Sequence, residues 1–177
     1  MDRMVAISVT AVVIAAIAAI MDVRERRIPN KLTYSASILG LLLQTIFWGW
    51  KGTLLGLLGG VVFGGVFLLF YIVHGMGAGD VKLAAALGCL VGAWASFKLM
   101  FATAVAGAIL AFIYMIRARR VTQTLRNTLA ILKFHRLFGL EAHPTVNLEN
   151  PEALRMPYGL AFAAGTVFWS MSIFLGR

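Results

Sequence analysis

Residues 4–21 read MVAISVTAVVIAAIAAIM, and residues 22–31 continue at once with DVRERRIPNK. The first stretch holds no charged side chain and approaches the roughly 20 apolar residues that a membrane-spanning helix needs. Basic residues directly after a span tend to hold that end in the cytoplasm. The pattern therefore predicts a first span with the N-terminus outside and Asp22 at the cytoplasmic edge, rather than a cleaved signal peptide.

The rest of the chain repeats this apolar character. It has 177 residues, of which 60% are hydrophobic and 13% are charged, far from the composition of a soluble domain. The composition predicts an all-α, polytopic membrane protein with a single embedded domain over residues 1–177. We expect about six spans, at Met4–Met21, Leu32–Trp50, Thr53–Val73, Val81–Phe97, Leu99–Ile116 and Pro157–Leu175.

The segment at about residues 117–156 is the largest polar part of the sequence, and we expect it to be cytoplasmic or interfacial. Its apolar residues recur at helical spacing among basic ones, which predicts an amphipathic helix on the inner membrane surface. Residues 143–157 contain three prolines, which predict an irregular loop.

The basic residues support this topology. Twelve of the 16 Lys and Arg residues fall on the predicted inner side, and the other four are Arg3, Lys51, Lys98 and Arg177. That asymmetry is what the positive-inside rule expects of a multi-pass protein, here in the inner (plasma) membrane of a cell. The net charge of +9 is thus assigned to topology and to contact with anionic lipid, and no nucleic-acid motif accompanies it.

Two of the seven acidic residues lie at span edges. Asp22 ends the first span, and Asp80 ends Gly77-Ala78-Gly79-Asp80. The chain is predicted to cross the membrane twice between them, so both face the same side. Carboxylates at such positions are costly and indicate function. Taken singly, Asp80 could cap a helix and Asp22 could pair with a nearby arginine.

The pair and its surroundings resemble the type IV prepilin peptidases, which are membrane aspartic proteases of the GxGD class, and most of all the short members of Flp-type (Tad) pilus systems. The resemblance implies that Asp22 and Asp80 are catalytic and that Gly77 and Gly79 are the family's glycines. Further matching positions, without an assigned role, are Lys82, Pro29, Asn30, Pro157, Tyr158 and Gly159.

The resemblance also implies a reaction and a substrate. We expect cleavage of the leader peptide from prepilins or pilin-like proteins at the cytoplasmic face, with no cofactor and no metal. Longer relatives carry a cytoplasmic segment with paired cysteines and methylate the new N-terminus. Here only nine residues, Val23 to Lys31, lie between Asp22 and the second predicted span, and Cys89 is the single cysteine, so we expect no N-methyltransferase activity.

Three other interpretations remain open at this point. A GxGD protease could act on other substrates. A small transporter or channel could use the two aspartates as an ion relay, although many transporters show an internal repeat, and none is found in this sequence. A degenerate family member could serve as an assembly subunit. His74 is a conceivable neighbour of the aspartates, whereas Cys89 is expected to be a buried apolar residue.

Overall fold

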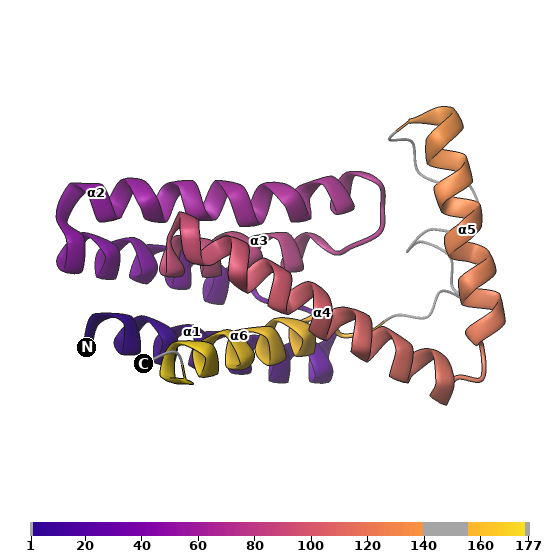
Figure 1. The fold of residues 1–177 in the computed structure, drawn as a ribbon, viewed down its shortest axis with the longest axis horizontal. Coiled ribbons are helices and arrows are strands. Elements are labelled where there is room, and N and C mark those ends of the chain that lie inside the picture. The colour runs from indigo at the N-terminus through magenta and orange to yellow at the C-terminus, as the bar shows by residue number, and fades with distance from the viewer. Residues whose placement is uncertain (1, 140–155, 176–177) are drawn as a thin grey trace.

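The computed structural model describes residues 2–139 and 156–175, and in these residues all regular structure is helical (Figure 1). The helices are α1 (Asp2–Glu25), α2 (Asn30–Ile72), α3 (Ala78–Val91), α4 (Ala93–Arg117), α5 (Val121–Phe138) and α6 (Tyr158–Leu175). Helices α1, α2, α4 and α6 are long and apolar enough to cross a membrane. The chain is thus an all-α, multi-pass membrane protein, as the sequence predicts.

Helix α2 accounts for two of the six predicted spans. Its 43 residues are interrupted at Gly49, whose φ of 65° and ψ of −154° are not helical. A positive φ is open to glycine because no Cβ obstructs it. The chain reverses there, so that the two arms of α2 lie side by side (Figure 1), and the hydroxyls of Thr45 and Thr53 meet across the turn at 2.7 Å.

The predicted boundary between the fourth and fifth spans is wrong. The sequence suggested a break between Phe97 and Leu99, whereas α3 ends at Val91 and α4 begins at Ala93. Gly92, with a φ of 80°, makes the turn. Ser96 does not break α4, because its hydroxyl donates to the carbonyl oxygen of Gly92 one turn earlier, at 2.8 Å.

A buried amide marks the end of α3. The Gln44 side chain is 4% exposed, and its Nε2 donates to the carbonyl oxygen of Leu90 at 2.8 Å. Carbonyl groups in the last turn of a helix have no partner within the helix. Gln44 supplies one from the first arm of α2, which fixes α3 against that arm.

Close backbone contact joins α3 to the two arms of α2. A Cβ added at Gly40 would lie 2.8 Å from Leu90 Cα, and one at Gly64 would lie 2.7 Å from Ala85 Cβ. Small residues let helices approach to this degree where lipid surrounds them. On the other side, the rings of Phe63 and Phe67 meet Phe162 of α6 at centroid distances of 5.9 and 5.2 Å. These contacts build the core.

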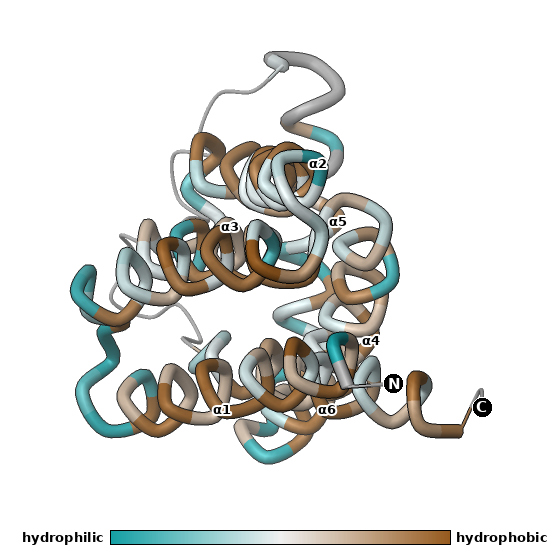
Figure 2. Tube along the Cα trace, turned by 90° about the vertical axis from the view of Figure 1, so that its left-hand side faces the viewer, coloured by the Kyte–Doolittle hydropathy of each residue, from teal (hydrophilic) through white to brown (hydrophobic). Residues whose placement is uncertain are grey.

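The outer surface of the bundle is apolar. Figure 2 shows hydrophobic residues over α1, α2, α4 and α6, and large side chains such as Ile46, Val61 and Phe101 are 70–73% exposed. Exposed apolar area on this scale marks a surface that something other than water covers. The bilayer is that cover in a multi-pass protein.

Helix α5 stands apart from the bundle, beyond the end where α3 begins and α4 ends (Figure 1). The predicted helix in this segment is confirmed, and Leu125 and Leu129 on it are 55% and 59% exposed. Its position on the inner membrane surface stays a prediction. Most of the predicted loop at 143–157 lies outside the described residues.

Candidate active site

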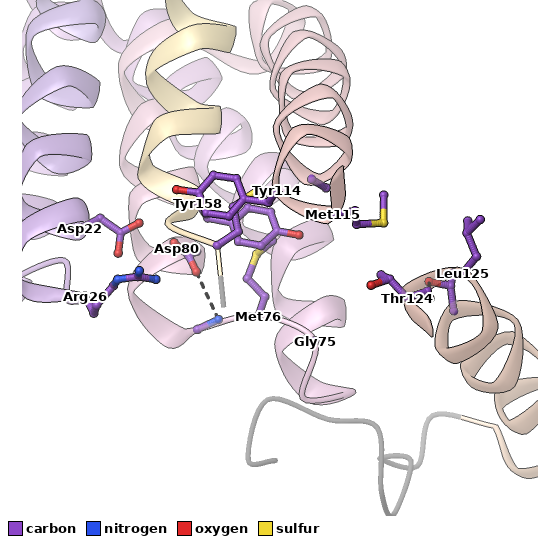
Figure 3. A pocket seen from close by; sticks show the side chains of 14 residues that line it. Asp22, Arg26, Gly75, Met76, Asp80, Tyr114, Met115, Thr124, Leu125 and Tyr158 are labelled. Atoms are coloured by element: carbon purple, nitrogen blue, oxygen red, sulfur yellow. Dashed lines mark hydrogen bonds between the residues drawn. The ribbon is translucent and has the colours of Figure 1, made fainter. Parts of the chain in front are cut away.

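Asp22 and Asp80 come from different helices to the same cleft. Asp22 lies in the last turns of α1 and Asp80 in the first turn of α3, so both are at the same end of the bundle. They line a cleft of about 800 Å³, and Figure 3 shows them on one side of it with Thr124 and Leu125 of α5 opposite. The prediction that the two carboxylates lie at one end therefore agrees with the structure.

Helix α6 holds Asp22 in place. The carboxylate is 8% exposed, and its Oδ2 accepts a hydrogen bond from the backbone N–H of Gly159 at 2.8 Å. Gly159 is in the first turn of α6, where free N–H groups and the helix dipole favour a negative charge. This contact gives the Pro157-Tyr158-Gly159 sequence a physical role that the sequence alone did not reveal.

Asp80 has a different environment. Its Oδ2 accepts a hydrogen bond from the Gly77 N–H at 3.2 Å. Burial, together with the neighbouring charge of Asp22, raises the pKa of Asp80 from 3.8 to about 7, although the Gly77 N–H acts in the opposite direction. Asp80 lies outside the four candidate spans. A carboxyl group with this pKa is about half protonated at pH 7, so Asp80 can hold a proton near neutral pH.

Neighbouring motif residues fix the start of α3 to the start of α2. A Cβ on Gly79 would lie 3.2 Å from Ile28 Cβ, so a larger residue would push α3 away. Lys82 Nζ donates to Asn30 Oδ1 at 2.8 Å and lies 5.7 Å from the centre of the Tyr34 ring. The close packing at Gly79 and the hydrogen bond from Lys82 to Asn30 therefore help to hold Asp80 in position.

A second cleft, of about 610 Å³, is also lined by the two aspartates. We call it the loop cleft, and it is lined by Asp22, Glu25, Arg26, Arg27, Ile28, Pro29, Asn30, Gly77, Ala78, Gly79, Asp80 and Lys82. We call the larger one the α4–α5 cleft, and it is lined by Asp22, Arg26, Gly75, Met76, Gly77, Asp80, Ala111, Tyr114, Met115, Thr124, Leu125, Thr128, Met156 and Tyr158. The two clefts meet at Asp22, Arg26, Gly77 and Asp80.

Some residues considered from sequence stand away from this site. His74 lines neither cleft, and its Nδ1 lies 3.1 Å from the carbonyl oxygen of Ile72. Cys89 is buried against Gly60 of α2, as expected of a structural residue. Within residues 2–139 and 156–175, no three His, Cys, Asp or Glu side chains gather as metal ligands.

Sequence reasoning missed the wall of the α4–α5 cleft. Tyr114 and Met115 come from the end of α4, and Thr124 and Thr128 come from α5. Thr124 and Thr128 are one helical turn apart, which predicts that they share a face of α5. Nothing in the sequence indicated that this face turns toward Asp80.

Comparison with known families decides the class of protein. Residues 9–112 match the sequence model of the type IV leader peptidase family. The match covers more than half of the chain and includes both aspartates. The chain belongs to the type IV leader peptidase family. No curated protein and no solved structure matches this leader peptidase.

Gly159 offers a direct test of the contact that holds Asp22. In Gly159→Ala, the added Cβ would lie 2.9 Å from both Ala19 Cα and Asp22 Cβ, so the start of α6 must move away from the carboxylate. Overpacking of this kind costs about 1–3 kcal/mol, and we expect peptidase activity to fall about tenfold or more. Cleavage rates are compared at equal membrane protein levels.

The matched control is Gly65→Ala. Gly65 also lies in a helix, but an added Cβ there meets nothing within 4 Å, so activity should stay at the wild-type level. If Gly159→Ala cleaves as fast as Gly65→Ala, the hydrogen bond from α6 does not position Asp22.

Proposed function

We propose that this leader peptidase is an aspartic endopeptidase of the GxGD type that removes the leader peptide from Flp-like prepilins. The observation that carries the proposal is the meeting of two carboxylates, Asp22 and Asp80, between two clefts at one end of the bundle. Two neighbouring carboxyl groups that share a proton can supply a base and an acid to the same reaction. That is the requirement for hydrolysing an amide bond without a covalent intermediate.

The environments of the two groups suggest their roles. Asp22 accepts the N–H at the start of α6 and acts as the ionised base that removes a proton from water. In its protonated form, which is about half of the molecules at pH 7, Asp80 donates its proton to the oxygen of the scissile carbonyl as water attacks the carbon. The tetrahedral intermediate then breaks its C–N bond, the proton on Asp22 passes to the leaving amine, and one hydroxyl of the intermediate returns its proton to Asp80 as the new carboxyl group forms.

Charge placement supports cleavage at the cytoplasmic face of the inner membrane. Arg24 lies in the last turn of α1 and Arg26 and Arg27 follow it at the aspartate end, and α4 ends in Arg117 at the same end. At the opposite end, Arg3 donates from Nη1 to the carbonyl oxygen of Phe47 at 2.7 Å. Basic residues thus concentrate at the end that holds Asp22 and Asp80, and such ends tend to remain in the cytoplasm.

The short connection between α1 and α2 bears on methylation. Only residues 26–29 separate the two helices, and Cys89 is the single cysteine. The connection has no length for the additional cytoplasmic segment expected of methylating relatives. We therefore propose that the cleaved pilin keeps an unmodified N-terminal amine.

A cleavage assay in membranes tests this function. The protein is co-expressed with a Flp-type prepilin, and the substrate is followed by gel shift and by mass spectrometry of the new N-terminus. We expect loss of the leader and an unmethylated amine. A prepilin that stays intact despite normal levels of the enzyme would overturn the proposed substrate. A methylated product would overturn only the proposal that the enzyme has no methyltransferase activity.

A further inference from the structure

The two clefts beside the aspartates differ in chemistry. Apart from the residues that they share, the α4–α5 cleft is lined without a single charged side chain among the described residues, and Met76, Met115 and Leu125 give it an apolar wall. The loop cleft instead contains Glu25 and Arg27, with Lys82 at its edge. The aspartates therefore lie at a boundary between an uncharged cleft and a charged one.

The α4–α5 cleft also lies next to exposed apolar side chains of the candidate spans. Its wall uses the last turns of α4 and the first turn of α6, which are both candidate spans. On α4, Ile113 and Ile116 are 42% and 52% exposed beside Met115. An apolar segment in the bilayer can thus reach this cleft from the side without losing its apolar surroundings.

We infer that the substrate crosses the aspartates in one direction, with the hydrophobic segment after the scissile bond in the α4–α5 cleft and the polar leader in the loop cleft. This inference rests on the proposed function, since it takes a prepilin as the substrate. It assigns Met115 and Leu125 to the hydrophobic segment. Arg27 is assigned to the leader.

Desolvation sets the direction. Placing charged leader side chains in the α4–α5 cleft would set them against its apolar wall of Met76, Met115 and Leu125, which is unfavourable for groups removed from water. Placing the hydrophobic segment in the loop cleft would bury the charged groups of Glu25, Arg27 and Lys82 under apolar groups. The arrangement that we infer places the hydrophobic segment beside apolar side chains and the leader beside polar and charged ones.

Site-specific photocrosslinking tests this direction. The photoreactive residue p-benzoylphenylalanine is placed singly at Met115, Leu125 or Arg27 in the Asp22→Asn enzyme, which binds the substrate without consuming it. Leu125 is 55% exposed, so the label there does not disturb the core. The fourth position, Phe101, is a control on the same helix as Met115 that is 72% exposed and lines neither cleft. Crosslinked peptides from a Flp-type prepilin are identified by mass spectrometry.

We expect positions 115 and 125 to label residues after the scissile bond, and position 27 to label the leader, with a several-fold lower yield at position 101. The reverse pattern, or labelling of one side from all three positions, would overturn the inference. Wild-type enzyme and the same prepilin are assayed in parallel membranes. If the wild-type enzyme cleaves the prepilin but the crosslinks are reversed, only the inferred direction of the substrate is overturned. If the wild-type enzyme does not cleave it, the proposed function and this inference are both overturned.

Discussion

Replacing Asp22 or Asp80 by asparagine should lower the rate of leader cleavage by about 10²- to 10⁴-fold, which is the usual contribution of general acid–base catalysis. Asparagine keeps the shape of the side chain, and its oxygen can still accept the N–H of Gly159 or Gly77. It cannot exchange a proton at neutral pH. The loss should therefore fall on kcat, with a smaller change in KM, when both are measured on a purified prepilin in detergent or vesicles.

The control for these variants is Asp2→Asn. Asp2 begins α1, at the opposite end of that helix from Asp22, and its substitution removes the same charge without touching the clefts. We expect wild-type cleavage from it. Because each aspartate acts within one unit, the double variant Asp22→Asn, Asp80→Asn should be hardly slower than either single variant. Normal cleavage by either single variant would contradict the two-carboxylate mechanism.

The pH profile should lose activity on its alkaline side. Burial and the charge of Asp22 raise the pKa of Asp80 to about 7, so the acid that protonates the carbonyl oxygen is present below pH 7 and is lost above it. We expect kcat/KM to fall about tenfold for each pH unit above this value, with the midpoint belonging to the pair of carboxyls. Arg26 and Tyr158 also face the pair in the cleft.

The stability of the fold should also decrease as the pH rises. Because the pKa of Asp80 rises from 3.8 to about 7 on folding, its contribution to stability is present in full below pH 3.8 and is lost as the pH rises through 7. A profile of kcat/KM between pH 5 and 9 checks the catalytic part. Activity that increases from pH 7 to 9 would show that Asp80 does not act as the acid.

The number and order of the apolar segments could be predicted from the sequence because each is an apolar run with at most one charged side chain. The number of crossings between Asp22 and Asp80 is even, and this parity is enough to predict that both lie at one end of the bundle. The border between α3 and α4 could not be found in this way. Hydropathy does not distinguish Gly92 from other glycines, and only its φ of 80° and the Gln44 amide beyond α3 stop the helix there.

For the site, too, one part could be predicted from the sequence and another part could not. The resemblance to prepilin peptidases indicated Asp22, Asp80, Gly77, Gly79 and Lys82, but it gave no reason for most of them. The reasons are contacts between segments far apart in the chain, such as Gly159 with Asp22, 137 residues away, and Lys82 with Asn30, 52 residues away. A single sequence does not specify such contacts, because its periodicity describes each helix alone.

The length of α3 has a consequence for the supply of water. Its 14 residues rise about 21 Å, whereas the hydrocarbon layer of a bilayer is about 30 Å thick. If α3 crosses the bilayer, the remaining distance would be made up by a local thinning of the lipid or by solvent at the start of the helix. Asp80 lies in that first turn, so we expect the shortness of this one helix to let water reach carboxylates that a full-length span would leave among acyl chains.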